Sequence, residues 1–142
     1  MTIAITPAGA GGLSVLGETL RPLTPGYGGI EIFETSGPAQ AGPPPHRHPW
    51  EEIYFVLEGT LELFDDGSWS TASAGATGTV PPNQVHSYRL GSAETRFLTI
   101  TGPGAARQFF EEMDAEITTL PPDIGRVLKV AGRNGLDVVL PG

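Results

Sequence analysis

The sequence contains no cysteine, which excludes disulfide bonds, thiolate metal ligands and a cysteine nucleophile. Basic residues are also scarce: eight lysines and arginines face sixteen aspartates and glutamates, so the formal net charge is -8 at pH 7. Because an acidic chain without a basic cluster repels phosphate backbones, we expect no nucleic-acid partner.

Long hydrophobic runs are absent as well. No stretch approaches the roughly 18 apolar residues that a membrane-spanning helix needs. Residues 1–16 lack the basic start and apolar run of a secretion signal. We therefore expect a cytoplasmic protein that does not interact with membranes, and the 142 residues fit one domain.

Glycine and proline, in contrast, are abundant, with 20 and 14 residues, while hydrophobic runs persist from Ile30 to Ile100. Disorder requires low hydrophobicity, so this mixture predicts an all-β fold of short strands joined by tight turns. Between residues 51 and 75 a strand-like apolar run bounded by glycine recurs about every eight residues. That spacing is typical of a small barrel or sandwich.

These patterns divide the domain into three segments. Residues 1–28 are predicted to form an arm with one or two weak strands, and residues 29–102 the barrel core. Residues 103–142 are predicted to add helices and a final strand near 136–140 to the same domain.

Two helices are expected in the C-terminal segment. Residues 105–117 have a helical composition, with an apolar stripe that favours packing against the barrel over a lid. Pro121-Pro122-Asp123 resembles the capped start of a second helix, which ends near Gly132.

The chain has only three histidines, and two of them form the pair His46-x-His48. Both share parity with Glu52, so an extended chain would point all three side chains to one side. A bend at Pro49 and Trp50 would weaken that reasoning. If the shared side is the barrel interior, one segment brings two imidazoles and one carboxylate to a single point.

The third histidine, His86, lies on a predicted strand at residues 85–90. Three imidazoles and one carboxylate suit one divalent transition metal ion (Fe, Mn, Ni, Cu or Zn) better than calcium or magnesium. A lone His-x-His pair is more often a polar surface pair than a metal site. Here no histidine lies outside the pattern, and this favours the metal site.

The same residues resemble the two motifs of the cupin superfamily. The first motif is His-x-His, three or four residues, glutamate, six residues and glycine, and this chain matches it from His46 to Gly59. The spacing selects Glu52 rather than Glu51. In the second motif, Gly75, Pro81 and His86 fall in register.

Three positions depart from the motifs: Gln40 and Asn83 stand where the family has glycine, and Leu90 stands where it has asparagine. None of them removes a ligand. The resemblance implies a jelly-roll barrel, or double-stranded β-helix, with short C-terminal helices. It also implies four metal ligands, which are His46, His48, Glu52 and His86.

Parity along the same strands predicts the lining of a pocket. Four residues share strand faces with the expected ligands: Tyr54, Val56, Tyr88 and Leu90. They predict a mostly apolar cavity with one or two phenol hydroxyls, which suits a small aromatic substrate. Core packing is the competing interpretation for both tyrosines. We take Glu52 and Tyr88 as candidate catalytic residues.

The layout is similar to that of small cupins of the quercetin 2,3-dioxygenase type, which implies a metal-dependent oxygenase with Glu52 as proton acceptor. Small cupins also include aromatic polyketide cyclases, so a non-oxidative zinc or nickel cyclase or isomerase is the alternative. A non-catalytic binder of small molecules is a third possibility. Cupins commonly pair through N-terminal strands, and we therefore expect a homodimer that exchanges the arm between Ile3 and Leu23.

Overall fold

The computed structural model describes residues 2–9 and 11–139. Its strands are β1 (Leu13–Val15), β2 (Glu18–Pro22), β3 (Glu31–Ser36), β4 (His46–Arg47), β5 (Glu52–Glu58), β6 (Thr60–Asp65), β7 (Ser68–Ser73), β8 (Thr77–Val80), β9 (His86–Leu90), β10 (Arg96–Thr101) and β11 (Asp137–Val138). Two helices, α1 (Ala106–Glu116) and α2 (Ile124–Arg133), lie between β10 and β11 in the sequence.

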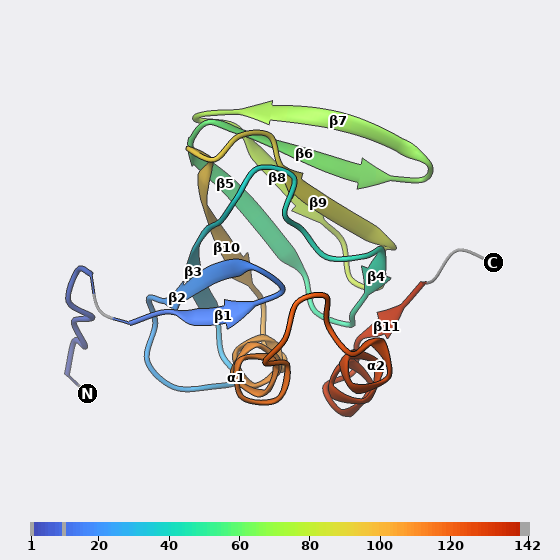
Figure 1. Ribbon diagram of the computed structural model, residues 1–142. Helices are drawn as coiled ribbons and strands as arrows, with labels where there is room; N and C mark the ends of the chain where they lie inside the picture. Colours follow the sequence, from blue (N-terminus) through green and yellow to red (C-terminus); the bar gives the residue numbers. More distant parts are fainter. Residues whose placement is uncertain (1, 10, 140–142) are drawn as a thin grey trace.

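The strands form two sheets that face each other (Figure 1). One sheet has the order β1-β2-β3-β10-β5-β8 and the other the order β11-β4-β9-β6-β7, with antiparallel pairing throughout. Consecutive strands such as β5 and β6 belong to opposite sheets, so the chain crosses repeatedly between them. This is a jelly roll, and the predicted all-β barrel with short C-terminal helices is confirmed.

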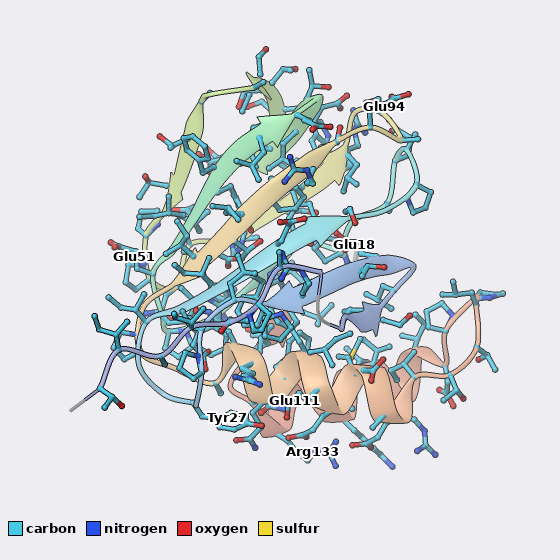
Figure 2. The ribbon with its side chains drawn as sticks, turned by 90° about the vertical axis from the view of Figure 1, so that its left-hand side faces the viewer. Glu18, Tyr27, Glu51, Glu94, Glu111 and Arg133 are labelled. Carbon is cyan, nitrogen blue, oxygen red and sulfur yellow. The ribbon has the colours of Figure 1, made fainter. Side chains whose placement is uncertain are left out.

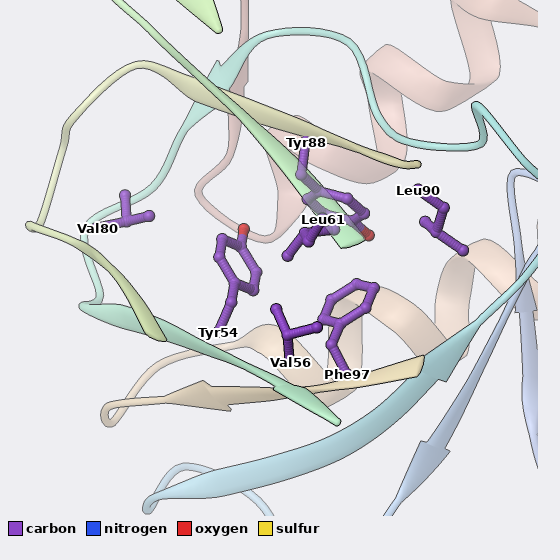
Figure 3. Packing of buried hydrophobic residues seen from close by; sticks show 7 residues of the cluster. All are labelled: Tyr54, Val56, Leu61, Val80, Tyr88, Leu90 and Phe97. Carbon is purple, nitrogen blue, oxygen red and sulfur yellow. The ribbon is translucent and has the colours of Figure 1, made fainter. Parts of the chain in front are cut away.

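Alternating burial along β3, β5 and β10 turns one face of each strand toward the space between the sheets. A cluster of buried side chains fills that space (Figure 3): Tyr54, Val56, Leu61, Val80, Tyr88, Leu90 and Phe97. The rings of Tyr54, Tyr88 and Phe97 meet edge to face, with centroids 5.3, 5.4 and 5.8 Å apart. This cluster packs the barrel interior beside the histidines.

Both helices lie at the same end of the barrel (Figure 1). Met113 of α1 and Val127 and Val130 of α2 form a second buried cluster with Val15 and Leu20 of the first two strands. The expected helices at 105–117 and 123–132 are therefore confirmed. Within the described residues, neither helix is long and apolar enough to span a membrane.

Carboxylates complete the start of each helix, where backbone N–H groups lack partners within the helix. Asp123 accepts a hydrogen bond from the Arg126 backbone N–H at 3.2 Å, which confirms the predicted cap of α2. Ala105, the residue before α1, makes no such bond with its side chain. Instead, Glu31 of β3 accepts from the Arg107 backbone N–H at 3.1 Å.

The N-terminal arm continues the first sheet, because β2 pairs with β3 of the same chain. The two weak strands predicted for residues 1–28 correspond to β1 and β2. At the other end, β11 pairs with β4, and the last residue of the predicted final strand, Leu140, lies outside the described residues.

The glycine positions of the two cupin motifs all have a positive φ, whichever residue occupies them. The values are 69° at Gln40, 70° at Gly59, 91° at Gly75 and 65° at Asn83. Glycine adopts this left-handed region without steric cost, and asparagine tolerates it. In glutamine, the Cβ atom crowds the backbone and strains this conformation. The two departures from the motif therefore keep the backbone path that the motif glycines specify.

Candidate metal centre

The three histidines converge inside the barrel, and their ligand nitrogens lie within 4.8 Å of one another. His46 and His86 open β4 and β9, and they face each other directly in the antiparallel pairing of these strands. His48 lies one residue beyond β4. All three side chains are buried, and His48 and His86 are each only 3% exposed.

Each imidazole is oriented by a backbone carbonyl two residues away. Nδ1 of His46 donates to Pro44 O at 2.9 Å, Nδ1 of His48 to Trp50 O at 2.9 Å, and Nδ1 of His86 to Gln84 O at 2.8 Å. A carbonyl oxygen only accepts, so Nδ1 carries a proton in each ring, and in the neutral imidazole Nε2 then presents a lone pair. This is the hydrogen-bonding pattern that orients metal-ligating histidines in proteins.

Glu52 approaches the histidines from the opposite sheet as the first residue of β5. Its Oε2 lies 2.7 Å from Nε2 of His48 and 3.6 Å from Nε2 of His86. Burial raises the pKa of Glu52, but the neighbouring imidazoles of His48 and His86 outweigh it and hold the pKa well below its usual range. Glu52 is therefore ionised at neutral pH.

A bend, not one extended strand, brings these ligands together. The chain leaves the strand conformation after Arg47 and turns at Pro49 and Trp50 before β5 begins in the other sheet. The bend considered at Pro49 and Trp50 is therefore present, and strand parity does not explain why Glu52 meets the histidines. The side chains converge because the two sheets face each other across the barrel.

The electrostatic state of His46 suits a metal ligand. Burial, followed by the charge of His86, lowers the pKa of His46 to about 4. His46 is consequently neutral at pH 7, the form in which imidazole donates a lone pair to a metal ion.

Two further observations fit a cation at this point. His86 Nε2 is buried without a hydrogen-bond partner among the described residues, although buried ring nitrogens are rarely left unpaired. Nε2 of His48 and Oε2 of Glu52 lie 2.7 Å apart, and so close an approach requires a proton or a cation between them. A divalent ion bound by three imidazoles and one carboxylate satisfies both requirements.

An apolar cavity of about 60 Å³ adjoins the ligands. His46, His48, Glu52 and Tyr88 line one part of it. Its remaining walls come largely from the helical end of the molecule: Phe109, Phe110, Met113, Val127 and Ala131. The apolar stripe of α1 therefore both packs in the core and covers the site.

The predicted pocket residues divide between cavity and core. Tyr88 lines the cavity beside the histidines. Tyr54, Val56 and Leu90 belong to the buried cluster between the sheets, where they pack with Phe97. The Tyr54 hydroxyl is buried and has no hydrogen-bond partner among the described residues.

Sequence reasoning missed the role of Trp50, which was considered only as part of a bend before Glu52. Its side chain is 5% exposed and stacks on the His48 ring, with centroids 4.4 Å apart and an interplanar angle of 10°. Its carbonyl also holds Nδ1 of His48. The one sequence feature that could have indicated this role is the position of Trp50, two residues after the predicted ligand His48.

Glu18 was missed as well. It lines the same cavity from β2 and is 3% exposed. It shares strand parity with Leu20, a core residue, and this pattern indicates an inward-facing carboxyl group. The strand is short and flanked by glycines, so the alternation of Glu18 and Leu20 was not recognised as a strand pattern.

Comparison with known proteins agrees with this fold. Residues 33–101, from β3 to β10, match the cupin domain family. A quercetin 2,3-dioxygenase of Bacillus subtilis (strain 168) is 31% identical over 83 residues, 58% of this chain. The matched part spans only 25% of that protein.

Comparison with solved structures also supports the fold. KdgF from Halomonas sp. matches with a TM-score of 0.65 and 15% identity, over 72% of this chain and 94% of that one. The polyketide cyclase RemF from Streptomyces resistomycificus matches with a TM-score of 0.61 and 21% identity, over 72% and 80%. At these identities the two structures establish the fold alone.

The fold and the buried histidines thus define a jelly-roll barrel with a candidate metal centre. Residues 33–101 match the cupin domain family, and the two-sheet fold agrees with that match.

Proposed function

We propose that this protein is a metal-dependent oxygenase of the quercetinase type, which inserts O2 into a small aromatic or enolisable substrate. The main support is the convergence of three Nε2 lone pairs and one ionised carboxylate at a buried point beside an apolar cavity. A divalent transition metal ion bound there supplies Lewis acidity and open coordination positions. The partial similarity to a quercetin 2,3-dioxygenase supports the same class.

Glu52 has two roles in this proposal. Together with His46, His48 and His86, it holds the ion. Because its carboxylate is ionised and faces the cavity, it also accepts the proton of a substrate enol or phenol hydroxyl. Loss of that proton leaves an oxyanion with the electron density that reaction with O2 requires.

The apolar walls of the cavity select the substrate and exclude water. A cavity of about 60 Å³ holds only a few water molecules, so an aromatic ring requires more room. Phe109, Phe110 and Met113 form the wall on α1, and we infer that this helix shifts outward when substrate enters.

One observation supports a second function, a non-oxidative cyclase or isomerase. The cavity contains two carboxyl groups in opposite states, because burial raises the pKa of Glu18 to about 8 whereas Glu52 is ionised. Such a pair can act as general acid and general base. That chemistry needs no O2, and a redox-inactive metal is sufficient for it.

Metal content and O2 uptake distinguish the two functions. The protein is purified without added metal and without nickel affinity resin, its metals are measured by elemental analysis, and O2 consumption is followed with a panel of phenols and flavonols. Iron, copper, manganese or nickel with O2 uptake supports the oxygenase. Stoichiometric zinc without O2 uptake supports the cyclase or isomerase. A protein that binds none of these metals would contradict both.

A further inference from the structure

The carboxyl group of Glu18 lies in the candidate substrate cavity, yet metal binding does not use it. Glu18 is the first residue of β2, next to the helical end of the molecule (Figure 2). Its side chain is 3% exposed and lines the cavity that His46, His48 and Glu52 also line. A buried acidic group therefore shares a small apolar space with the metal ligands.

Few polar partners compensate for this burial. The Tyr88 hydroxyl alone approaches both carboxyl oxygens of Glu18, at 2.8 and 3.0 Å. Among the described residues, no lysine, arginine or histidine forms an ion pair with Glu18. A carboxylate with one donor in an apolar cavity is costly, and the group responds by retaining its proton at neutral pH.

Glu31, a second buried glutamate, has a structural role with which Glu18 can be compared. Glu31 is 2% exposed, but its oxygens accept backbone N–H bonds from Gly28 at 3.3 Å and from Arg107 at 3.1 Å. Glu31 thereby caps α1. Glu18 caps no helix and pairs with no cation, so packing and capping do not account for it.

We propose that Glu18 is a substrate-binding group whose carboxyl O–H donates a hydrogen bond to a second oxygen of the substrate, one that the metal does not hold. Tyr88 is a positioning residue, since its hydroxyl fixes the carboxyl group from the opposite sheet. The substrate class that fits is a small aromatic molecule with two separated oxygen atoms, one for the metal centre and one for Glu18. The inference rests on the proposed function, because it places the substrate in this cavity.

The test uses zinc-loaded protein and three simple probes: phenol, resorcinol and hydroquinone. Zinc does not promote oxidation of these phenols, so binding is measured alone, by NMR titration. We expect resorcinol or hydroquinone to bind roughly three- to tenfold more tightly than phenol, the gain of one hydrogen bond. In Glu18→Met, which keeps the length of the side chain, that gain disappears, while the affinities for zinc and phenol are unchanged.

Glu31→Gln is the matched control, because Glu31 is equally buried but outside the cavity lining, and it should keep the full gain. If neither diphenol binds more tightly than phenol, or if Glu18→Met keeps the gain, the role of Glu18 is refuted while the proposed function stands. If the wild-type protein binds neither zinc nor phenol, the proposed function fails and the inference fails with it.

A second measurement follows the wild-type protein directly and uses a variant only to assign an infrared band. The infrared C=O stretch of a protonated carboxyl group is expected in the wild-type protein at pH 7, and it shifts when the tighter diphenol binds but not when phenol binds. Glu18→Gln removes the band and thereby assigns it. A band that is insensitive to the diphenol would overturn the inference.

Discussion

The Tyr88 hydroxyl meets both carboxyl oxygens of Glu18, at 2.8 and 3.0 Å, and thereby joins the two sheets of the barrel beside the candidate metal centre. Burial raises the pKa of Glu18 from 4.5 to about 8. The folded state thus holds a proton that the unfolded chain releases. The stability that this group contributes is greatest below pH 4.5 and is lost as the pH rises toward 8.

Glu18→Gln removes this pH dependence. We expect the free energy of unfolding of the variant to rise relative to the wild type between pH 4 and pH 8, by on the order of 4 kcal/mol in total. Urea unfolding of both proteins at several pH values measures the difference. If the free energies of unfolding of the two proteins change with pH by the same amount, the pKa of Glu18 is not raised by folding.

His86→Ala should abolish most metal retention, because it removes one of the three imidazoles of the candidate centre, whose buried Nε2 has no hydrogen-bond partner among the described residues. Elemental analysis after dialysis measures the effect. Arg47→Ala is the matched control: it lies between two ligands in sequence, but its side chain is about half exposed and pairs with Asp137. Equal metal content in the two variants would refute the ligand assignment.

Glu52→Gln should lower kcat by roughly a hundredfold or more, because the amide retains the shape of the side chain but cannot accept a proton. Its metal content should fall less than that of His86→Ala. Glu51→Gln changes the neighbouring exposed carboxylate and should leave turnover unchanged. If Glu51→Gln is the more damaging substitution, the selection of Glu52 by motif spacing is incorrect.

Gln40→Gly should stabilise the protein by about 1 kcal/mol, since Gln40 has a φ of 69° and the substitution removes the strain of its Cβ. Asn83→Gly, at a φ of 65°, should gain less because asparagine tolerates this region. Thermal unfolding of the two variants gives the order. A loss of stability in Gln40→Gly would mean that the side chain of Gln40, not its backbone, stabilises the loop.

We propose that the protein is a homodimer that associates through its N-terminal arm. Ile3 and Ile5 are 93% and 85% exposed, and they precede β1, which lies at the edge of its sheet. An exposed edge strand preceded by apolar side chains favours association. Sedimentation velocity should show a dimer for the wild type and a monomer for Ile3→Asp/Ile5→Asp. A monomeric wild type refutes the proposal.

Local patterns in the sequence were sufficient to predict most of this fold. The glycine-bounded apolar runs between residues 51 and 75 located β5 and β6, and the strand expected at residues 85–90 corresponds to β9. Asp123 located the start of α2 because capping is a local interaction. The two-residue strand β4 has no local signal, since tertiary pairing alone defines it, whereas β11 lies within the final strand expected near residues 136–140.

The site was predictable to the extent that it depends on spacing. Motif spacing selected His46, His48, Glu52 and His86, whose side chains the structure brings together. Parity alone was a poor guide to the pocket, because Val56 and Leu90 face inward but lie in the packed cluster. Strand parity with Leu20 indicates that Glu18 faces inward, but no local pattern encodes its contact with Tyr88, which lies 70 positions away in the sequence.

The acceptors that orient the three imidazoles are the backbone carbonyls of Pro44, Trp50 and Gln84. A side-chain substitution cannot delete a backbone carbonyl group. Point mutations elsewhere in the pocket therefore leave the orientation of the three imidazole rings unchanged. Selection acting on the cavity wall can thus exchange one substrate for another without rebuilding the centre. The histidine arrangement is thus fixed by the backbone, whereas the cavity wall is formed by replaceable side chains. This makes the chain a favourable starting point for directed evolution of new substrate ranges.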